Sequence, residues 1–266
     1  MKNLIVLLFL STLSIAFGQN QKLLVSKLNY IPVNTDQFLG YDQFGFYYSI
    51  KDNTLSKTKE DESFQYKNPS LGKITKVNFQ NPLKIVLFYE DFNTAILLDN
   101  QLNESQKINF SESTTPLLVS AIGIASQNKL WVYNSLIQQI ELYDYLKNTS
   151  KSISTPIPNK IKYYQSDSNK LYWIDDKNDS YSCDMYGKIT RVGKIPNFEM
   201  IQILNENQFI FTTNNILYFG DYKLPNQEML IKIEILEKTL QNFSYKDQIL
   251  SIFTSEGITN YKITTP

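Results

Sequence analysis

The densest group of side chains that could bind a metal is the segment DDKNDS, residues 175–180. Asp175, Asp176 and Asp179 could offer oxygen ligands to calcium, which prefers carboxylate and carbonyl oxygens. An EF-type calcium loop also needs glycine at its sixth position and glutamate at its twelfth, and neither is present. Because the segment is rich in residues that stabilise turns, a solvated turn is the favoured interpretation. We therefore expect no metal and no cofactor.

Two adjacent carboxylates, Glu90 and Asp91, could take part in glycoside hydrolysis. That reaction needs two carboxyl groups at a set separation, which neighbours in sequence do not predict. A sialidase-type site would also need several arginines, and Arg191 is the only arginine in the chain. A carboxylate-based hydrolase is therefore kept only as a minor alternative.

The chain contains no histidine and one cysteine, Cys183. The missing histidine removes Ser-His-Asp and Cys-His catalysis, histidine general bases and the usual zinc sites. A single cysteine cannot form an internal disulfide, and burial as a small hydrophobic residue is favoured over a reactive thiol. These absences predict a protein that is not an enzyme.

Aromatic side chains are abundant, with 18 Tyr, 16 Phe and 2 Trp. Sugars and peptides stack on such rings, and Trp131, Trp173, Tyr172 and Tyr47 are the candidates for ligand binding. The alternative is that these rings pack in a core, and the repeated arrangement of the sequence favours it.

Six stretches of the sequence resemble one another. Each begins with Asn or Asp, continues into a short apolar-aromatic run, and reaches a second alternating run after a polar turn. The stretches begin at Asp42, Asn81, Asn128, Asn169, Asn207 and Asp247, with spacings of 39, 47, 41, 38 and 40 residues by subtraction. Trp131 and Trp173 lie three and four residues after the start of their stretches, and this similar placement favours packing between adjacent sheets.

The stretch Asn128–Asn148 could be an amphipathic helix or two strands. Tyr133, Leu136, Ile137 and Ile140 fit one helical face, but the aromatic and β-branched residues around them fit strands. Since every copy carries a polar break at the same place, we expect two strands with a turn near residues 134–138.

A third apolar run precedes most copies and a short strand-like piece follows, which gives about four strands per forty residues. This is typical of β-propeller blades, and the sequence predicts an all-β, six-bladed propeller. A β-sandwich and a helical repeat are the alternatives. The blade cores are expected near residues 42–59, 81–100, 128–148, 169–188, 207–224 and 247–264. The run Lys22–Leu28 is expected to join the C-terminal blade and close the ring.

The N-terminus is typical of a secretory signal peptide. Lys2 precedes an apolar run from Leu4 to Phe17, and Ala16-Phe17-Gly18 resembles a cleavage site. Cleavage of residues 1–18 would leave a single domain of 266 − 18 = 248 residues, 19–266. No cysteine lies at the cut for lipid attachment, and no other stretch is long enough to span a membrane. The formal net charge of +0 gives no reason to expect nucleic acid as a partner.

The segments NPLKIVLFYEDFNTAILLDNQLNE, from Asn81, and LWVYNSLIQQIELYDY, from Leu130, resemble exported β-propeller proteins of the Bacteroidota. The resemblance runs through most of the chain after the signal segment and implies the fold and the export, with no known activity. The chain lacks both the Gly-His…Trp-Asp repeat and the Ser-x-Asp-x-Gly-x-Thr-Trp box of better-known propellers.

Together these observations predict a non-catalytic, periplasmic or secreted propeller that is monomeric and presents loops to a protein partner of the cell envelope. The main alternative is a propeller that binds glycans through aromatic side chains exposed together on one face.

Overall fold

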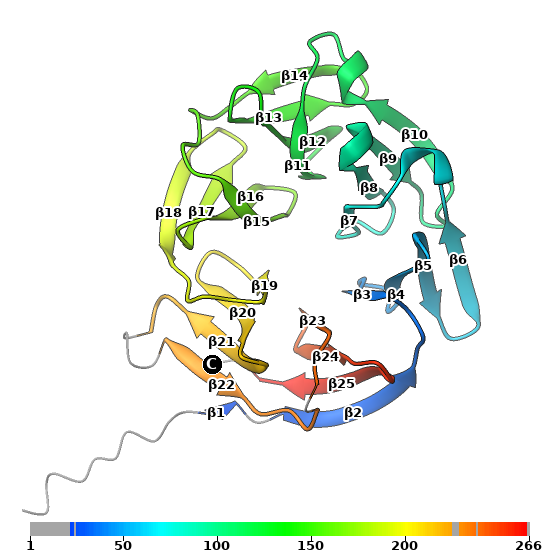
Figure 1. Cartoon of the computed structure of the whole chain (residues 1–266), viewed down its shortest axis with the longest axis vertical. Coiled ribbons are helices and arrows are strands. Elements are labelled where there is room, and N and C mark those ends of the chain that lie inside the picture. The colour runs from blue at the N-terminus through cyan, green and yellow to red at the C-terminus, as the bar shows by residue number, and fades with distance from the viewer. Residues whose placement is uncertain (1–21, 24, 225–228, 238, 265–266) are drawn as a thin grey trace, which may run out of the picture.

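The computed structural model describes residues 22–23, 25–224, 229–237 and 239–264, so the predicted signal peptide lies outside the described residues. Six sheets surround a central axis (Figure 1); each contains four antiparallel strands, and one of them has an additional fifth strand. Each sheet is one blade, and the chain is a six-bladed β-propeller, as the repeats predicted.

Blades are numbered here from the first complete one in the chain, and strands are given from the axis outward. The first blade contains β3 (Gln37–Tyr41), β4 (Tyr47–Lys51), β5 (Thr54–Lys59) and β6 (Glu62–Tyr66). The second contains β7 (Lys76–Asn78), β8 (Ile85–Tyr89), β9 (Thr94–Leu98) and β10 (Glu104–Asn109). The third contains β11 (Val119–Ile124), β12 (Lys129–Asn134), β13 (Gln139–Asp144) and β14 (Thr149–Ser152). Three short 3-10 helices connect these strands: η1 (Pro69–Leu71), η2 (Glu90–Phe92) and η3 (Phe110–Glu112).

The other three blades repeat the pattern. The fourth contains β15 (Ile161–Ser166), β16 (Lys170–Asp175), β17 (Asp179–Asp184) and β18 (Ile189–Lys194). The fifth contains β19 (Met200–Ile203), β20 (Gln208–Thr213), β21 (Ile216–Asp221) and β22 (Leu230–Ile233), with β1 (Lys22–Leu23) added outside. The sixth contains β23 (Asn242–Lys246), β24 (Ile249–Phe253), β25 (Gly257–Ile263) and β2 (Val25–Pro32). The stretch Asn128–Asn148 therefore contains two strands, β12 and β13, and not a helix.

The N-terminal segment closes the ring, but its boundaries differ from the prediction of a single strand over Lys22–Leu28. The strand that joins the C-terminal blade is β2, which pairs antiparallel with β25, and the two lie side by side in Figure 1. β1 pairs instead with β22 of the fifth blade, in parallel. The side chain of Leu23 in β1 is buried between the fifth and sixth blades. The bulge at Leu28 leaves the Leu28 side chain 51% exposed.

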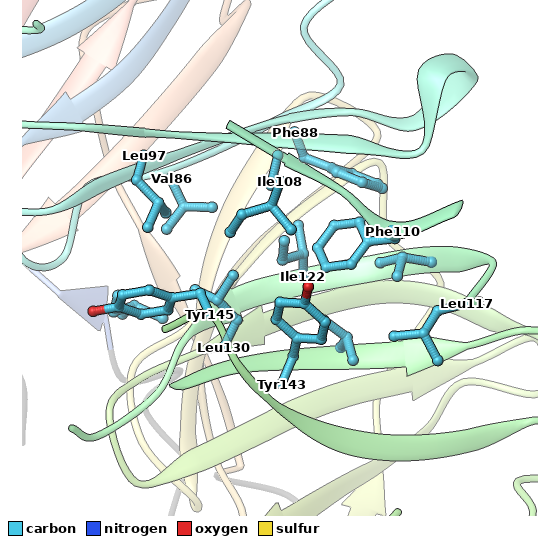
Figure 2. Packing of buried hydrophobic residues seen from close by; sticks show 14 residues of the cluster. Val86, Phe88, Leu97, Ile108, Phe110, Leu117, Ile122, Leu130, Tyr143 and Tyr145 are labelled. Atoms are coloured by element: carbon cyan, nitrogen blue, oxygen red, sulfur yellow. The ribbon is translucent and has the colours of Figure 1, made fainter. Parts of the chain in front are cut away.

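The core consists of layers of apolar side chains between adjacent blades. In the third blade, Leu130 and Val132 pack against the second blade, whereas Trp131 and Tyr133 pack against the fourth. Successive side chains of a strand point to opposite faces of its sheet, so the central strands bury both faces. Figure 2 shows the layer between the second and third blades. This two-sided burial is why the central strands read as nearly continuous apolar runs.

Aspartates stabilise the turns between the third and fourth strands. One carboxylate oxygen of Asp99, of Asp144 and of Asp184 accepts hydrogen bonds from two backbone N–H groups of its own turn. This is the local bonding that favours aspartate in turns. These three aspartates therefore have a structural role in their turns.

The inner strand of every blade begins at one face of the ring and ends at the other. We call the first the top face; it also carries the turns between second and third strands, such as residues 135–138. The opposite, bottom face carries the other two turns of each blade, such as residues 125–128 and 145–148. No helix in the described ranges is long and apolar enough to cross a membrane.

Candidate functional site

The acidic segment 175–180 spans the turn between β16 and β17, and two of its three carboxylates have partners. Asp175 is fully buried; its Oδ1 accepts hydrogen bonds from the backbone N–H groups of Lys177 and Asp179, both at 2.9 Å. Its Oδ2 accepts a hydrogen bond from Asn159 at 2.7 Å. The carboxylate of Asp179 forms an ion pair with Arg191 at 2.6 Å, and Asp176 is exposed. No cluster of three or more metal-binding side chains occurs within the ranges that the structure describes.

The aromatic candidates lie mainly between blades. Trp131 and Trp173 are buried in one cluster, and the indole N–H of Trp131 donates to the backbone oxygen of Asp167 at 2.9 Å. Tyr172 is 8% exposed and belongs to the next cluster, while Tyr47 is half-buried beside Tyr41 in the first blade. The four rings therefore form no common surface. Burial likewise raises the pKa of the Cys183 thiol to about 12, so this cysteine is not a ready nucleophile.

Four exposed apolar side chains lie on the top face of the second and third blades. We call them the Leu118 patch, which consists of Phe92, Leu118, Leu136 and Ile137. Their side chains are 51%, 48%, 65% and 45% exposed, respectively. Phe92 and the pair Leu136–Ile137 come from equivalent turns of the two blades, and Leu118 comes from the connection between the blades.

Two asparagines hold the Leu118 patch in place. The buried side chain of Asn93 donates to the backbone oxygen of Leu117 at 2.6 Å and accepts from the backbone N–H of Val119 at 3.0 Å. These two bonds fix the backbone on both sides of Leu118. Asn134 accepts from the backbone N–H groups of Leu118 and Leu136, at 3.4 and 3.1 Å. The exposed leucines are therefore presented by an ordered, hydrogen-bonded frame.

The rim of the Leu118 patch is acidic. Glu90 and Asp91 precede Phe92 in η2. Glu112 lies in η3, which belongs to the same connection between blades as Leu118. All three acidic side chains are exposed. Partial burial and the neighbouring charge of Asp91 raise the pKa of Glu90. Neither Glu90 nor Asp91 lines the cavity of about 940 Å³ or the cavity of about 380 Å³.

The second candidate is a cavity of about 940 Å³ along the axis of the ring, which we call the channel. Its wall is formed by the inner strands and is rich in amide, hydroxyl and tyrosine side chains. A volume of this size is in the range of small-molecule sites. A smaller cavity of about 380 Å³ shares Gln37, Ile50 and Ile74 with it, which widens the channel between the first and second blades.

Several of the channel amides hold neighbouring blades together. Gln165 of β15 donates to the backbone oxygen of Ile203 in β19 at 2.7 Å and accepts from its N–H at 3.2 Å. Gln202 makes the same two bonds with Tyr245 of the next blade, both at 2.7 Å. These amides satisfy backbone groups at the edges of inner strands, where an unpaired buried group would be costly.

The wall near the third blade has a different arrangement, because two side chains of β7 reach past β11 to β15. The amide of Asn78 donates to Ser166 Oγ at 3.1 Å, and Lys76 Nζ donates to the backbone oxygen of Tyr164 at 3.2 Å. Gly123 of β11 lies beneath this bridge, where a Cβ atom would be 1.8 Å from Ser166 Oγ. A glycine is therefore required for the approach of the two strands.

The sequence patterns did not single out Lys76 or Leu118. Lys76 is one of many lysines, and its contact with Tyr164 joins residues 88 positions apart. For the Leu118 patch a signal did exist, since Leu136 and Ile137 are apolar residues within a segment predicted to be a polar turn.

No protein-family model and no curated protein matches this sequence. Solved structures do match, at identities that show the fold alone. A streptogramin B lyase is 12% identical with a TM-score of 0.55, covering 90% of this chain and 97% of that one. The Swd1 β-propeller domain of Myceliophthora thermophila is 10% identical with a TM-score of 0.57, covering 90% and 100%. The extracellular domain of a one-component system from B. thetaiotaomicron is 12% identical with a TM-score of 0.51, covering 90% of this chain and 40% of that one.

Proposed function

We propose that this chain is an exported, non-catalytic propeller that binds a protein partner through the Leu118 patch. The observation that carries the proposal is the presence of four exposed apolar side chains on one face, with the backbone at Leu118 and Leu136 fixed by buried asparagines. Grouped and ordered apolar side chains rimmed by polar ones are the usual mark of an interaction site, whereas single exposed ones are not.

The acidic rim specifies the chemistry of the partner. Glu90, Asp91 and Glu112 flank the apolar side chains, and no ion pair is found for these three carboxylates in the described part of the chain. A segment with apolar side chains flanked by lysine or arginine complements this surface. Rim charges of this kind act mainly on the association rate and on the choice of partner.

A lyase activity like that of some structural neighbours is not supported. One of the matching structures is a virginiamycin B lyase described as catalytically inactive after a single histidine was changed to alanine. This chain has no histidine at all and therefore no counterpart of that residue. The buried Cys183 and the bonded carboxylate of Asp175 supply no alternative catalytic group.

Export is proposed from the N-terminal segment and from the resemblance to exported Bacteroidota propellers. The absence of a disulfide is compatible with the periplasm, because a chain of this length can bury a sufficient core without one. Recovery of a mature chain that begins near Gln19 from the periplasm or medium would test this part of the proposal.

The binding surface can be tested with a matched pair of substitutions in the third blade. Leu136 on the top face and Leu146 on the bottom face are 65% and 66% exposed. Leu136→Asp adds a negative charge to the Leu118 patch, and Leu146→Asp adds one to the opposite face. The wild type and both variants would be used for quantitative affinity capture from the cell envelope of the native host.

We expect the recovery of at least one protein to fall about tenfold or more with Leu136→Asp. A tenfold loss of affinity corresponds to about 1.4 kcal/mol, which is typical for a side chain that contributes strongly to an interface. Leu146→Asp should leave that recovery unchanged. Equal recovery of every captured protein with all three chains would contradict the assignment of the binding surface.

A further inference from the structure

Lys76 is a cation on the channel wall without an acidic partner. Its ammonium group lies 4.6 Å from the centre of the Tyr164 ring and 5.6 Å from that of Tyr163, and it makes one hydrogen bond, to the backbone oxygen of Tyr164. No carboxylate forms an ion pair with it within the described residues. Removal from water alone lowers its pKa to about 8.

The same fold shows how a buried lysine is otherwise compensated. Lys57 lies between the first two blades with its Nζ 3.8 Å from Asp42 Oδ2, and it also donates to the backbone oxygen of Asn100 at 2.8 Å. Burial of a charge is costly unless the charge is paired. Lys76 lacks such a pair and makes a single hydrogen bond, although an ammonium group can donate three.

The channel wall as a whole combines polar and apolar side chains and carries a formal excess of one positive charge. Its charged side chains are Lys76, Lys246 and Asp247. Four amides of the wall make no side-chain hydrogen bond to other described residues and are free to bind a ligand: Gln37, Gln43, Gln80 and Gln248. Of these four, Gln37 lies at the same end of the channel as Lys76, because Gln37 begins β3 and Lys76 begins β7 at the top face, whereas the other three follow inner strands at the bottom face.

We propose that the channel binds a small organic carboxylate that also carries hydroxyl groups, such as a hexuronic acid, with the carboxylate on Lys76. A charge-assisted hydrogen bond from an ammonium group to a carboxylate is among the stronger polar contacts available. The free amides suit hydroxyl groups, which both donate and accept. This binding site is separate from the Leu118 patch and does not depend on the proposed protein partner.

The test uses two sugars that differ mainly in charge. D-Glucuronate carries a carboxylate where D-glucose has a hydroxymethyl group, and sodium acetate carries a carboxylate without the hydroxyl groups. Isothermal titration calorimetry at pH 7 would measure each with the wild type, with Lys76→Met and with Lys147→Met. Lys147 is a matched control because its side chain is 78% exposed, far from the axis.

We expect glucuronate to bind the wild type at least tenfold more tightly than glucose or acetate. Lys76→Met should lose that preference, whereas Lys147→Met should keep it. Circular dichroism and urea unfolding would confirm that Lys76→Met is folded. A second measurement is the pKa of the Lys76 amine from NMR titration, which should rise when glucuronate is bound, because the carboxylate stabilises the charged form.

The other outcomes overturn the proposal in distinct ways. Equal binding of glucose and glucuronate would remove the role of the charge, and equal binding of acetate and glucuronate would leave a simple anion site without recognition of hydroxyl groups. If no compound binds, or if Lys76→Met binds like the wild type, the channel is not a site of this class. None of these results bears on the Leu118 patch.

Discussion

Asp42 and Lys57 form a buried ion pair near the bottom face. Asp42 Oδ1 accepts from the backbone N–H of Phe44 at 2.8 Å, and its Oδ2 accepts from the hydroxyl of Tyr48 at 3.1 Å. The side chains of Lys57 and Asp42 are 3% and 0% exposed. Burial lowers the pKa of Lys57, and the charge of Asp42 acts in the opposite direction. The stability of this interface therefore depends on the carboxylate.

Asp42→Asn should destabilise the protein by about 3–5 kcal/mol, because Lys57 would remain buried without a counter-charge. Asparagine keeps the Oδ1 acceptor of the turn, so the loss reports on the charge together with the contact between Oδ2 and the Tyr48 hydroxyl. Combining Asp42→Asn with Lys57→Met should recover part of the stability. Urea unfolding would measure each variant, with the exposed Asp61→Asn as a control expected to change stability by less than about 0.5 kcal/mol. A double variant less stable than Asp42→Asn alone would contradict this account.

At the scale of the strand, the hairpins of each blade follow directly from local sequence. β12 and β13 are apolar runs separated by a turn, and Asp144 stabilises the following turn through its own backbone. Such features depend on neighbours in the chain, so the sequence reveals them. The closing strand was placed with less accuracy, because its partner β25 is more than 200 residues away in sequence and the bulge at Leu28 interrupts the register.

The difference between local and long-range contacts also explains which functional residues the sequence could predict. Acidic turns and aromatic runs are visible as local patterns, and the structure places them in turns and between blades. The Leu118 patch and the environment of Lys76 arise from contacts between blades. Asn93 reaches Leu117 over 24 residues, and Asn78 reaches Ser166 over 88. Periodicity within one repeat carries no information on which side chains meet across two repeats.

Shortening the N-terminus tests the two closing strands separately. A chain that begins at Val25 loses β1 and the buried Leu23, and should be less stable by about 2 kcal/mol. A chain that begins at Val33 also loses β2 and leaves β25 as an open edge. Because an exposed strand edge pairs readily with other chains, this second form should aggregate or unfold. Urea unfolding and size-exclusion chromatography would measure both, and a stable monomer beginning at Val33 would show that β2 is dispensable.

At the scale of the whole ring, the response to alkaline pH depends on lysine and tyrosine together. Burial lowers the pKa of Lys76 to about 8, whereas an unfolded lysine titrates near 10.4. Between these values the unfolded chain binds more protons than the folded chain, so this group makes stability rise with pH. Buried tyrosines have the opposite effect. Burial is the first cause of a raised pKa for a tyrosine in each blade: Tyr48, Tyr89, Tyr143, Tyr163, Tyr222 and Tyr261.

Above about pH 10 an unfolded tyrosine loses its proton while these folded ones retain theirs, so stability should fall as the pH rises further. We therefore expect the free energy of unfolding to increase between pH 7.5 and 9.5 and to decline beyond about pH 10. Lys76→Met should reduce the increase by about 1 kcal/mol after allowance for solvent in the channel, and should leave the decline unchanged because the tyrosines remain. Urea unfolding at several pH values would measure both limbs, with Lys147→Met as the exposed control. If Lys76→Met keeps the full increase, the ammonium group is hydrated in the folded ring and does not account for the rise in stability.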